Sequence, residues 1–251
     1  MAIQKQVFEY RDGETLCRGE LAWDDATPGR RPGVLVVHEG GGINDHPKRR
    51  AALLAELGYV ALACDMFGGG QYVSDRKRGG ELMAALRSDP QTLRRRVQAG
   101  LDALAAQPLV DAAHLAAIGF CFGGMTVLEL ARSGAPIAGV VSFHGILDTP
   151  LPAQPGAVKA KVLVLHGADD PYAPPPKVNA FIEEMRQAQA DWQLNVYGGA
   201  QHGFTRPDAA QLGIPGVAYH AQTDRRAWQA MQGFFAELFG SGGLPASTTS
   251  G

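Results

Sequence analysis

The chain contains 251 residues, of which 45% are hydrophobic and 19% are charged, and its formal net charge is -2. This composition is typical of a globular protein with a sizeable core, and it predicts a single α/β domain over residues 1–240. The nearly balanced charge excludes a strongly basic surface, so no nucleic-acid partner is expected. No apolar run approaches the ~18 residues needed to span a bilayer, which predicts no membrane partner.

Three cysteines, Cys17, Cys64 and Cys121, cannot all form disulfide bonds with one another. We interpret Cys17 and Cys64 as small buried apolar residues rather than as parts of a disulfide scaffold. The first residues lack a basic flank followed by an apolar core, so no signal peptide is expected. The sequence therefore predicts a cytoplasmic protein with a flexible C-terminal tail, residues 241–251.

Two β segments, 3–10 and 15–23, are joined by a turn at Asp12 and Gly13 and predict an antiparallel start. Further strands are expected at 34–38, 59–64, the residues before Cys121, 139–143, 162–166 and 194–197. Helices are expected at 46–57, about 80–87, 90–106, 124–133, about 175–190 and about 223–239. This alternation predicts an α/β fold with a mostly parallel, twisted sheet and helices on both of its faces.

Arginines are concentrated in two segments of this pattern. Residues 68–80 are expected to form a loop that carries Arg76, Lys77 and Arg78. The run 94–96 consists of three arginines in a predicted helix, and we interpret it as a solvated helix face.

Residues 117–125 combine a short apolar strand, a Gly-x-Cys-x-Gly turn and the start of a helix. This layout is typical of a nucleophile elbow, in which the central residue projects at the top of the sheet and the two glycines keep the space around it clear. Cys121 is therefore a candidate nucleophile. It stands at a helix N-terminus, where the helix dipole favours the thiolate over the thiol.

A cysteine nucleophile needs a base and a group that orients the base. The strand at 162–166 runs into a loop that contains Asp169 and Asp170, and the next strand is followed by a loop that contains His202. The carboxyl ends of parallel strands meet at one edge of the sheet, so these side chains are expected near Cys121. At this point either aspartate could be the acid.

These segments resemble the dienelactone hydrolase family of α/β-hydrolases, which use a Cys-His-Asp triad. The resemblance is carried by HEGGG at 38–42, GFCFGG at 119–124, HGADD at 166–170 and HGF at 202–204, and it covers the chain from residue 34 to the final helix. It implies an α/β-hydrolase fold, a carboxymethylenebutenolidase-like activity and no cofactor. The family pattern places the acid three residues after a glycine and four before a proline, which selects Asp170 over Asp169.

The resemblance also implies roles for the residues around Cys121. Glu39 matches a glutamate that contacts the resting thiol and helps to activate it when substrate binds. The backbone N–H groups of Phe122 and Gly40 match an oxyanion hole. His202 takes the proton from Cys121 and returns it to the leaving group.

Arg206 lies where the family has an arginine that binds a substrate carboxylate, and Arg76 or Arg78 could supply a second one. Each of these arginines could instead be a solvated surface residue. The other residues expected to line the pocket are Phe67, Tyr72, His144 and Phe204. No metal is expected, because His38, His46 and His166 do not have the spacing of known metal motifs.

We predict a hydrolase of activated esters or lactones, since a thiolate attacks enol and aryl esters more productively than ordinary alkyl esters. Neutral phosphotriesters are a further candidate substrate. The expected partner is a small molecule, and the expected state is a monomer or weak homodimer. Two alternatives stay open: a broad-specificity esterase or thioesterase, and a redox or electrophile sensor in which Cys121 reacts without turnover.

Overall fold

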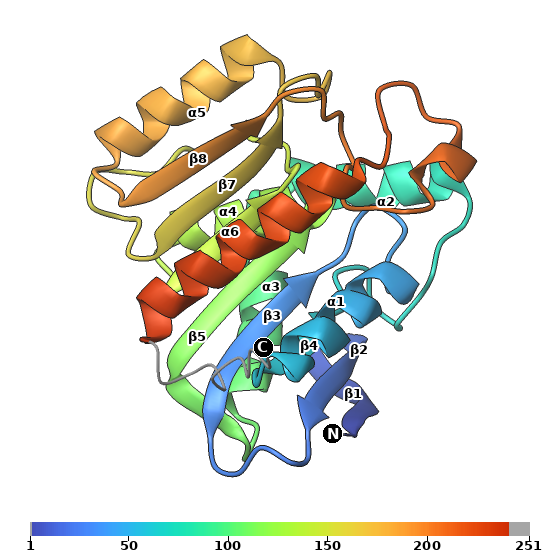
Figure 1. The fold of residues 1–251 in the computed structure, drawn as a ribbon, viewed down its shortest axis with the longest axis vertical. Coiled ribbons are helices and arrows are strands. Elements are labelled where there is room, and N and C mark those ends of the chain that lie inside the picture. The colour runs from blue at the N-terminus through green and yellow to red at the C-terminus, as the bar shows by residue number, and fades with distance from the viewer. Residues whose placement is uncertain (1, 241–251) are drawn as a thin grey trace, which may run out of the picture.

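The computed structural model of the protein describes residues 2–240, and the tail predicted at 241–251 lies outside this range. Its strands form one eight-stranded sheet in the order β1-β2-β4-β3-β5-β6-β7-β8 (Figure 1). The strands are β1 (Ile3–Asp12), β2 (Thr15–Asp24), β3 (Arg31–Val37), β4 (Val60–Cys64), β5 (Val110–Phe120), β6 (Gly139–Phe143), β7 (Lys161–Gly167) and β8 (Trp192–Tyr197).

Within the described residues, the α-helices follow successive strands from β3 onward, with two helices between β4 and β5 and none between β6 and β7. They are α1 (Asp45–Glu56), α2 (Arg76–Ser88), α3 (Pro90–Ala105), α4 (Phe122–Arg132), α5 (Pro175–Gln187) and α6 (Ala221–Phe239), and a short 3-10 helix covers Ala209–Leu212. Within residues 2–240, none of these helices combines the length and the apolar character that crossing a lipid bilayer would require.

The pairing of the strands confirms the predicted antiparallel start. β1 and β2 form an antiparallel hairpin, and β2 also runs antiparallel to β4. From β4 through β3, β5, β6 and β7 to β8, all neighbours are parallel. The carboxyl ends of six strands therefore lie at the same edge of the sheet, where the candidate site residues were expected.

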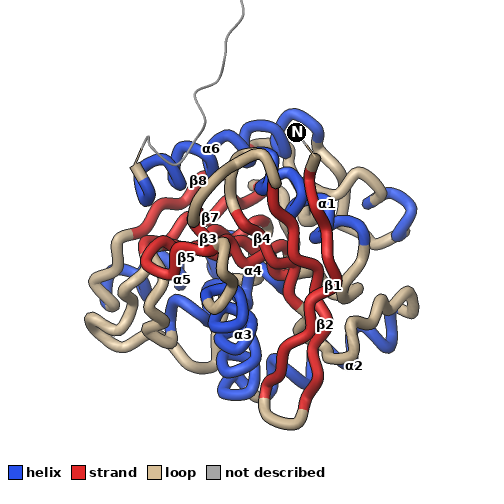
Figure 2. Tube along the Cα trace, turned by 90° about the horizontal axis from the view of Figure 1, so that it is seen from below, coloured by secondary structure: helices blue, strands red, loops and turns tan. Residues whose placement is uncertain are grey.

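Side chains of the sheet alternate between two hydrophobic cores. In β3, Val34 and Val36 belong to the core shared with α1 and α6, whereas Leu35 and Val37 belong to the core shared with α3, α4 and α5. Figure 2 shows α6 on one side of the sheet and α3 on the other. Because both faces are covered, β4 and β6 are buried along their whole lengths.

The segment 68–80 is not a loop throughout, as the sequence had suggested, because α2 begins at Arg76. Asp75 precedes the helix and accepts a hydrogen bond from the N–H of Lys77, which satisfies one of the free donors of the first turn. Only Gly79 and Leu86 of this helix are buried. Helix α2 is therefore attached to the rest of the protein by few buried side chains.

The arginine run at 94–96 is solvated, as predicted, only at Arg95, because Arg94 is partly buried and Arg96 is buried. Arg95 Nε and Arg96 Nε donate to the two oxygens of the buried Asp12 carboxylate at 2.7 and 2.6 Å, and Arg94 pairs with the buried Glu129 at 2.7 Å. These bonds join α3 to the β1–β2 hairpin and to α4. The partners are distant in the sequence, so no local pattern indicates them.

The carboxylate of Asp65 organises the turn that follows β4. It is fully buried and accepts hydrogen bonds from the N–H groups of Arg18, Phe67, Gly68 and Gly70 at 2.7 to 3.1 Å. These donors satisfy the hydrogen-bonding capacity of the buried carboxylate. Asp65 therefore fixes the loop between β4 and α2 at its β4 end.

Candidate active site

Cys121 occupies the sharp turn between β5 and α4. Its φ of 54° lies in the left-handed region, where a residue with a side chain is strained. A Cβ atom on Gly119 would overlap the carbonyl of Gly123, and a Cβ atom on Gly123 would overlap the carbonyl of Val37. The turn therefore requires both glycines, and it presents the partly exposed Cys121 at the N-terminus of α4.

The loops after β7 and β8 bring an acid and a base together. His202 Nδ1 lies 2.8 Å from Asp170 Oδ2, and both side chains are buried. The other oxygen of Asp170 accepts the N–H of Tyr172 at 2.8 Å, which fixes the carboxylate. Asp169 is exposed to solvent. Of the two aspartates, the structure thus places Asp170 against the histidine.

The charge state of His202 depends on its two neighbours. Burial alone lowers the pKa of the ring, but the charge of Cys121, the hydrogen bond with Asp170 and the hydrogen bond with Cys121 outweigh it and raise the pKa of His202 to about 10. At neutral pH the ring is therefore a cation between a sulfur atom and a carboxylate.

Phe122 and Gly40 carry the two backbone donors that the family resemblance matches to an oxyanion hole. The N–H of Phe122, the first residue of α4, and the N–H of Gly40, in the loop after β3, have no hydrogen-bond partner in the described part of the chain. The side chain of Phe122 packs against His38 and Phe67, which holds its backbone in place.

Glu39 is a buried carboxylate in the same loop, with 4% of its surface exposed. Within residues 2–240 its ion-pair partner is His46, whose Nδ1 lies 2.7 Å from Glu39 Oε1. Burial raises the pKa of Glu39, but His46, with smaller contributions from Arg206 and His38, lowers it below its ordinary value. The sequence pattern indicated His46 only as a candidate metal ligand. Its position at the start of α1, just after the HEGGG segment, was the available signal.

The sequence predicts that His144 lines the pocket, but in the structure the side chain lies behind the turn with 1% of its surface exposed. Its Nδ1 accepts the Cys121 N–H at 3.1 Å, and its Nε2 lies 2.8 Å from Thr205 Oγ1. Burial, together with the charges of His202 and His46, lowers the pKa of His144 well below its ordinary value. The ring is therefore neutral, so Nδ1 keeps the lone pair that supports the backbone of Cys121.

The structure places the three predicted arginines differently. Arg206 follows His202 by four residues and its side chain is 14% exposed, but its Nε and Nη2 donate to the two oxygens of Asp208 at 2.7 and 2.9 Å. Arg76 and Arg78 are exposed on the first turn of α2, and Arg78 pairs with Glu81 at 3.4 Å.

The aromatic residues that we expected in the pocket also divide into two groups. Phe204 is fully buried and Phe67 nearly so, and both pack in the hydrophobic cores. Tyr72 is 61% exposed. Sequence reasoning missed Tyr172, a partly exposed ring whose centroid lies 4.9 Å from that of His202. The signal was its position two residues after Asp170.

The histidines considered as metal ligands have other contacts. His38 Nε2 accepts the Met66 N–H at 3.1 Å, and its Nδ1 lies 2.6 Å from the carbonyl oxygen of Glu39. His166 is buried beneath the acid loop. Across residues 2–240, no three His, Cys, Asp or Glu side chains are grouped so that they could hold a metal ion.

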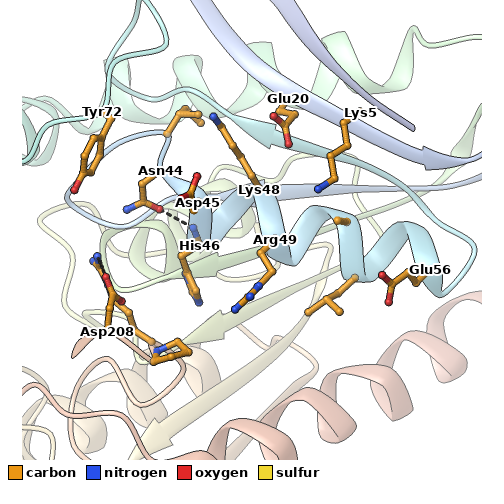
Figure 3. Close-up of a pocket in the computed structure, with 15 residues that line it drawn as sticks. Lys5, Glu20, Asn44, Asp45, His46, Lys48, Arg49, Glu56, Tyr72 and Asp208 are labelled. Atoms are coloured by element: carbon orange, nitrogen blue, oxygen red, sulfur yellow. Dashed lines mark hydrogen bonds and ion pairs between the residues drawn. The ribbon is translucent and has the colours of Figure 1, made fainter. Parts of the chain in front are cut away.

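A groove of about 1100 Å³ runs along α1 beside these residues. Figure 3 shows Tyr72, His46 and Asp208 toward one end of it, and Lys5 and Glu56 toward the other. Arg206 also lines the groove, whereas Cys121 does not. The groove reaches the candidate site through His46, the partner of Glu39.

Comparison with known proteins assigns this arrangement to a family. The model of the "Dienelactone hydrolase family" matches residues 18–239. A solved structure of a dienelactone hydrolase-like promiscuous phosphotriesterase from metagenomic libraries is 46% identical, with a TM-score of 0.90 over 96% of this chain and 100% of that one. A Bradyrhizobium protein described as a probable 2-oxo-3-(5-oxofuran-2-ylidene)propanoate lactonase is 32% identical over 231 residues, which cover 84% of this chain and 92% of the relative. An uncharacterised protein of Caenorhabditis elegans is 39% identical over 150 residues, 59% of this chain and 94% of the relative.

Proposed function

This chain belongs to the dienelactone hydrolase family and is a hydrolase that acts on ester or lactone bonds of small molecules, and we propose that Cys121, His202 and Asp170 carry out the reaction through an acyl-enzyme. The observation that carries the proposal is the environment of His202. Its ring is buried between the Asp170 carboxylate, at 2.8 Å, and Cys121, and the two neighbours raise its pKa to about 10.

The first half of the reaction forms a thioester. The Cys121 thiolate, stabilised by the His202 cation, attacks the carbonyl carbon, and the negative charge moves to the carbonyl oxygen. The N–H groups of Phe122 and Gly40 bind that oxyanion. When the tetrahedral intermediate collapses, the bond to the leaving oxygen breaks, and His202 donates its proton to that oxygen.

The second half releases the acid. His202, now neutral, takes a proton from water, and the resulting hydroxide attacks the thioester carbonyl. The carbon–sulfur bond breaks, which returns the thiolate next to a protonated His202. Asp170 keeps Nδ1 of the ring as a donor throughout, so Nε2 is the atom that gives and receives protons.

Glu39 has the role of controlling the thiol in this proposal. A bare thiolate is open to oxidation, so a cysteine enzyme benefits from keeping its nucleophile inactive until substrate arrives. In the structure Glu39 pairs with His46 at 2.7 Å. This pairing supports a state in which Glu39 is turned away from the sulfur and the nucleophile is ready to react.

Hydrolysis of neutral phosphotriesters is a second candidate activity. It is favoured by the 46% identity to a protein described as a promiscuous phosphotriesterase. The same thiolate and N–H donors would serve an attack on phosphorus, since negative charge again develops on an oxygen of the reacting centre.

A burst experiment tests the mechanism. The protein is mixed with 4-nitrophenyl acetate, and release of nitrophenolate is followed together with the intact mass. We expect an initial burst and a mass increase of one acetyl group on Cys121, and we expect Cys121→Ala and His202→Ala to lose turnover. Wild-type turnover in both variants would refute the triad. A labelled Cys121 without any turnover would instead favour the sensor alternative.

A further inference from the structure

Acidic and basic side chains at the candidate site form three close pairs. The pairs are His202 with Asp170, His46 with Glu39, and Arg206 with Asp208. The first belongs to the proposed reaction and the second to the proposed control of the thiol. The third has no role in either, and both of its residues line the groove along α1.

Arg206 is held by Asp208 through both arms of the guanidinium. Nε and Nη2 donate to separate carboxylate oxygens at 2.7 and 2.9 Å, a bidentate geometry in which each charge is directly opposite the other. A substrate carboxylate could take these two donors only by displacing Asp208, an intramolecular competitor two residues away. At the remaining N–H groups of the guanidinium it would meet a charge that Asp208 already neutralises.

The surroundings of Arg206 also disfavour a second anion. Glu39 lies close enough for the two charges to shift each other's pKa, which lowers that of Glu39 and raises that of Arg206. Arg206 thus stands between two carboxylates, Glu39 and Asp208, and its positive charge is already compensated. A negatively charged substrate would therefore gain little attraction from Arg206.

On this basis, and resting on the function proposed above, we propose that Asp208 is a specificity-determining residue. By neutralising Arg206 it makes the site selective for uncharged activated esters, lactones and phosphotriesters over lactones that carry a carboxylate. Replacement of Asp208 by a neutral side chain frees the guanidinium and converts the site into one that accepts a carboxylate.

The groove provides the space that such a substrate would use. Arg206 and Asp208 line it together with His46 and Tyr72, and Figure 3 shows Tyr72 and Asp208 toward the same end. A substituent that extends from the reacting carbonyl into this end of the groove would meet the Arg206–Asp208 pair. A charge on that substituent would therefore interact directly with the pair.

A matched pair of substrates separates charge from shape. We would compare kcat/KM for (5-oxofuran-2-ylidene)acetate and for its methyl ester, which differ in one negative charge. The wild-type protein is expected to prefer the methyl ester. Asp208→Asn is expected to raise kcat/KM for the carboxylate roughly tenfold relative to the methyl ester, the size of one additional charge-assisted hydrogen bond.

Two further variants control the result. Glu81→Gln removes the same charge from the exposed Arg78–Glu81 pair and should leave the ratio unchanged. The double variant Arg206→Gln/Asp208→Asn should lose the gain, because the freed guanidinium is absent.

The outcomes distinguish this proposal from the proposed function. A wild-type preference for the carboxylate, or an unchanged ratio in Asp208→Asn, would overturn the specificity role while leaving the hydrolase mechanism intact. An equal shift in Glu81→Gln would overturn it too, since the effect would then be one of overall charge. If wild type and Cys121→Ala hydrolyse both substrates equally, the proposed mechanism itself is wrong.

Discussion

The carboxyl ends of β5, β7 and β8 and the helix α2 border the same site, but they are built differently. Asp170 and His202 are buried and hydrogen-bonded to each other. Cys121 is fixed by a turn that tolerates only glycine two residues before and two residues after it. Helix α2, in contrast, buries only Gly79 and Leu86. The difference shows that the sheet fixes the reacting groups, whereas α2, which packs on the Gly40 loop, is held by few buried side chains.

The two regions contact each other at the loop that contains Gly40. A Cβ atom on Gly79 of α2 would lie 2.7 Å from the carbonyl oxygen of Gly40, and a Cβ atom on Gly40 would lie 2.6 Å from Met83 Sδ. The loop that supplies the proposed Gly40 donor is thus packed directly under α2. If the contrast between the regions holds, substitutions at the strand ends change activity by orders of magnitude, and most substitutions on α2 change little.

The largest effect is expected at Asp170. Asp170→Asn replaces the carboxylate by an amide, which can neither stabilise a protonated His202 nor select the ring tautomer. The value of kcat should therefore fall by a factor on the order of 10³ to 10⁴. Steady-state hydrolysis of an aryl ester measures this directly.

The neighbouring acid provides a matched control for that substitution. Asp169→Asn changes the same charge one residue away, at an exposed position, and should keep kcat within about twofold of wild type. Comparable losses in both variants would show that the charge of the loop matters and not the contact of Asp170 with His202.

The next effect concerns the protonation of His202. Cys121 contributes more than Asp170 to raising the pKa of the ring to about 10. NMR titration should therefore find a larger fall of this pKa in Cys121→Ala than in Asp170→Asn. The reverse order would mean that the carboxylate, and not the sulfur, keeps the ring charged.

The same pKa has a consequence for stability. It is raised above the unfolded value of about 6.5, so the stabilisation by the charged ring is complete below about pH 6.5 and is lost as the pH rises through about 10. Urea unfolding of the wild type across this pH range should show a declining free energy of unfolding, and Cys121→Ala should show a smaller decline.

Sequence predicted the strand-end region well because its signals are local. The Gly-x-Cys-x-Gly turn follows from steric requirements, and loops after successive parallel strands must meet at one edge. The register of the sheet brings Asp170 and His202 together once the order of strands is known. Most strands and helices followed from apolar periodicity for the same reason.

The errors lie where partners are distant in the sequence or where local signals conflict. Gly79 and Gly80 disfavour a helix, so the sequence places the start of α2 too late, although Asp75 caps it. The arginines at 94–96 have their carboxylate partners on β1 and α4, and His46 has its partner on the β3 loop. His144 and Phe204 stand at strand ends like site residues, but depth in the core cannot be derived from position along the chain.

The smallest effects are expected for alanine substitutions at two adjacent glycines of α2, only one of which contacts the Gly40 loop. Gly80→Ala adds a methyl group where no atom lies within 4 Å. Alanine favours the helix by about 1 kcal/mol, which should raise Tm by about 2–4 °C without changing kcat/KM. Gly79→Ala makes the same chemical change, but its Cβ meets the Gly40 carbonyl at 2.7 Å. It should therefore lower Tm and, by moving the loop with the proposed oxyanion donor, reduce kcat/KM roughly tenfold. Thermal unfolding and ester hydrolysis of both variants test this, and identical behaviour of the two would show that α2 does not press on the Gly40 loop.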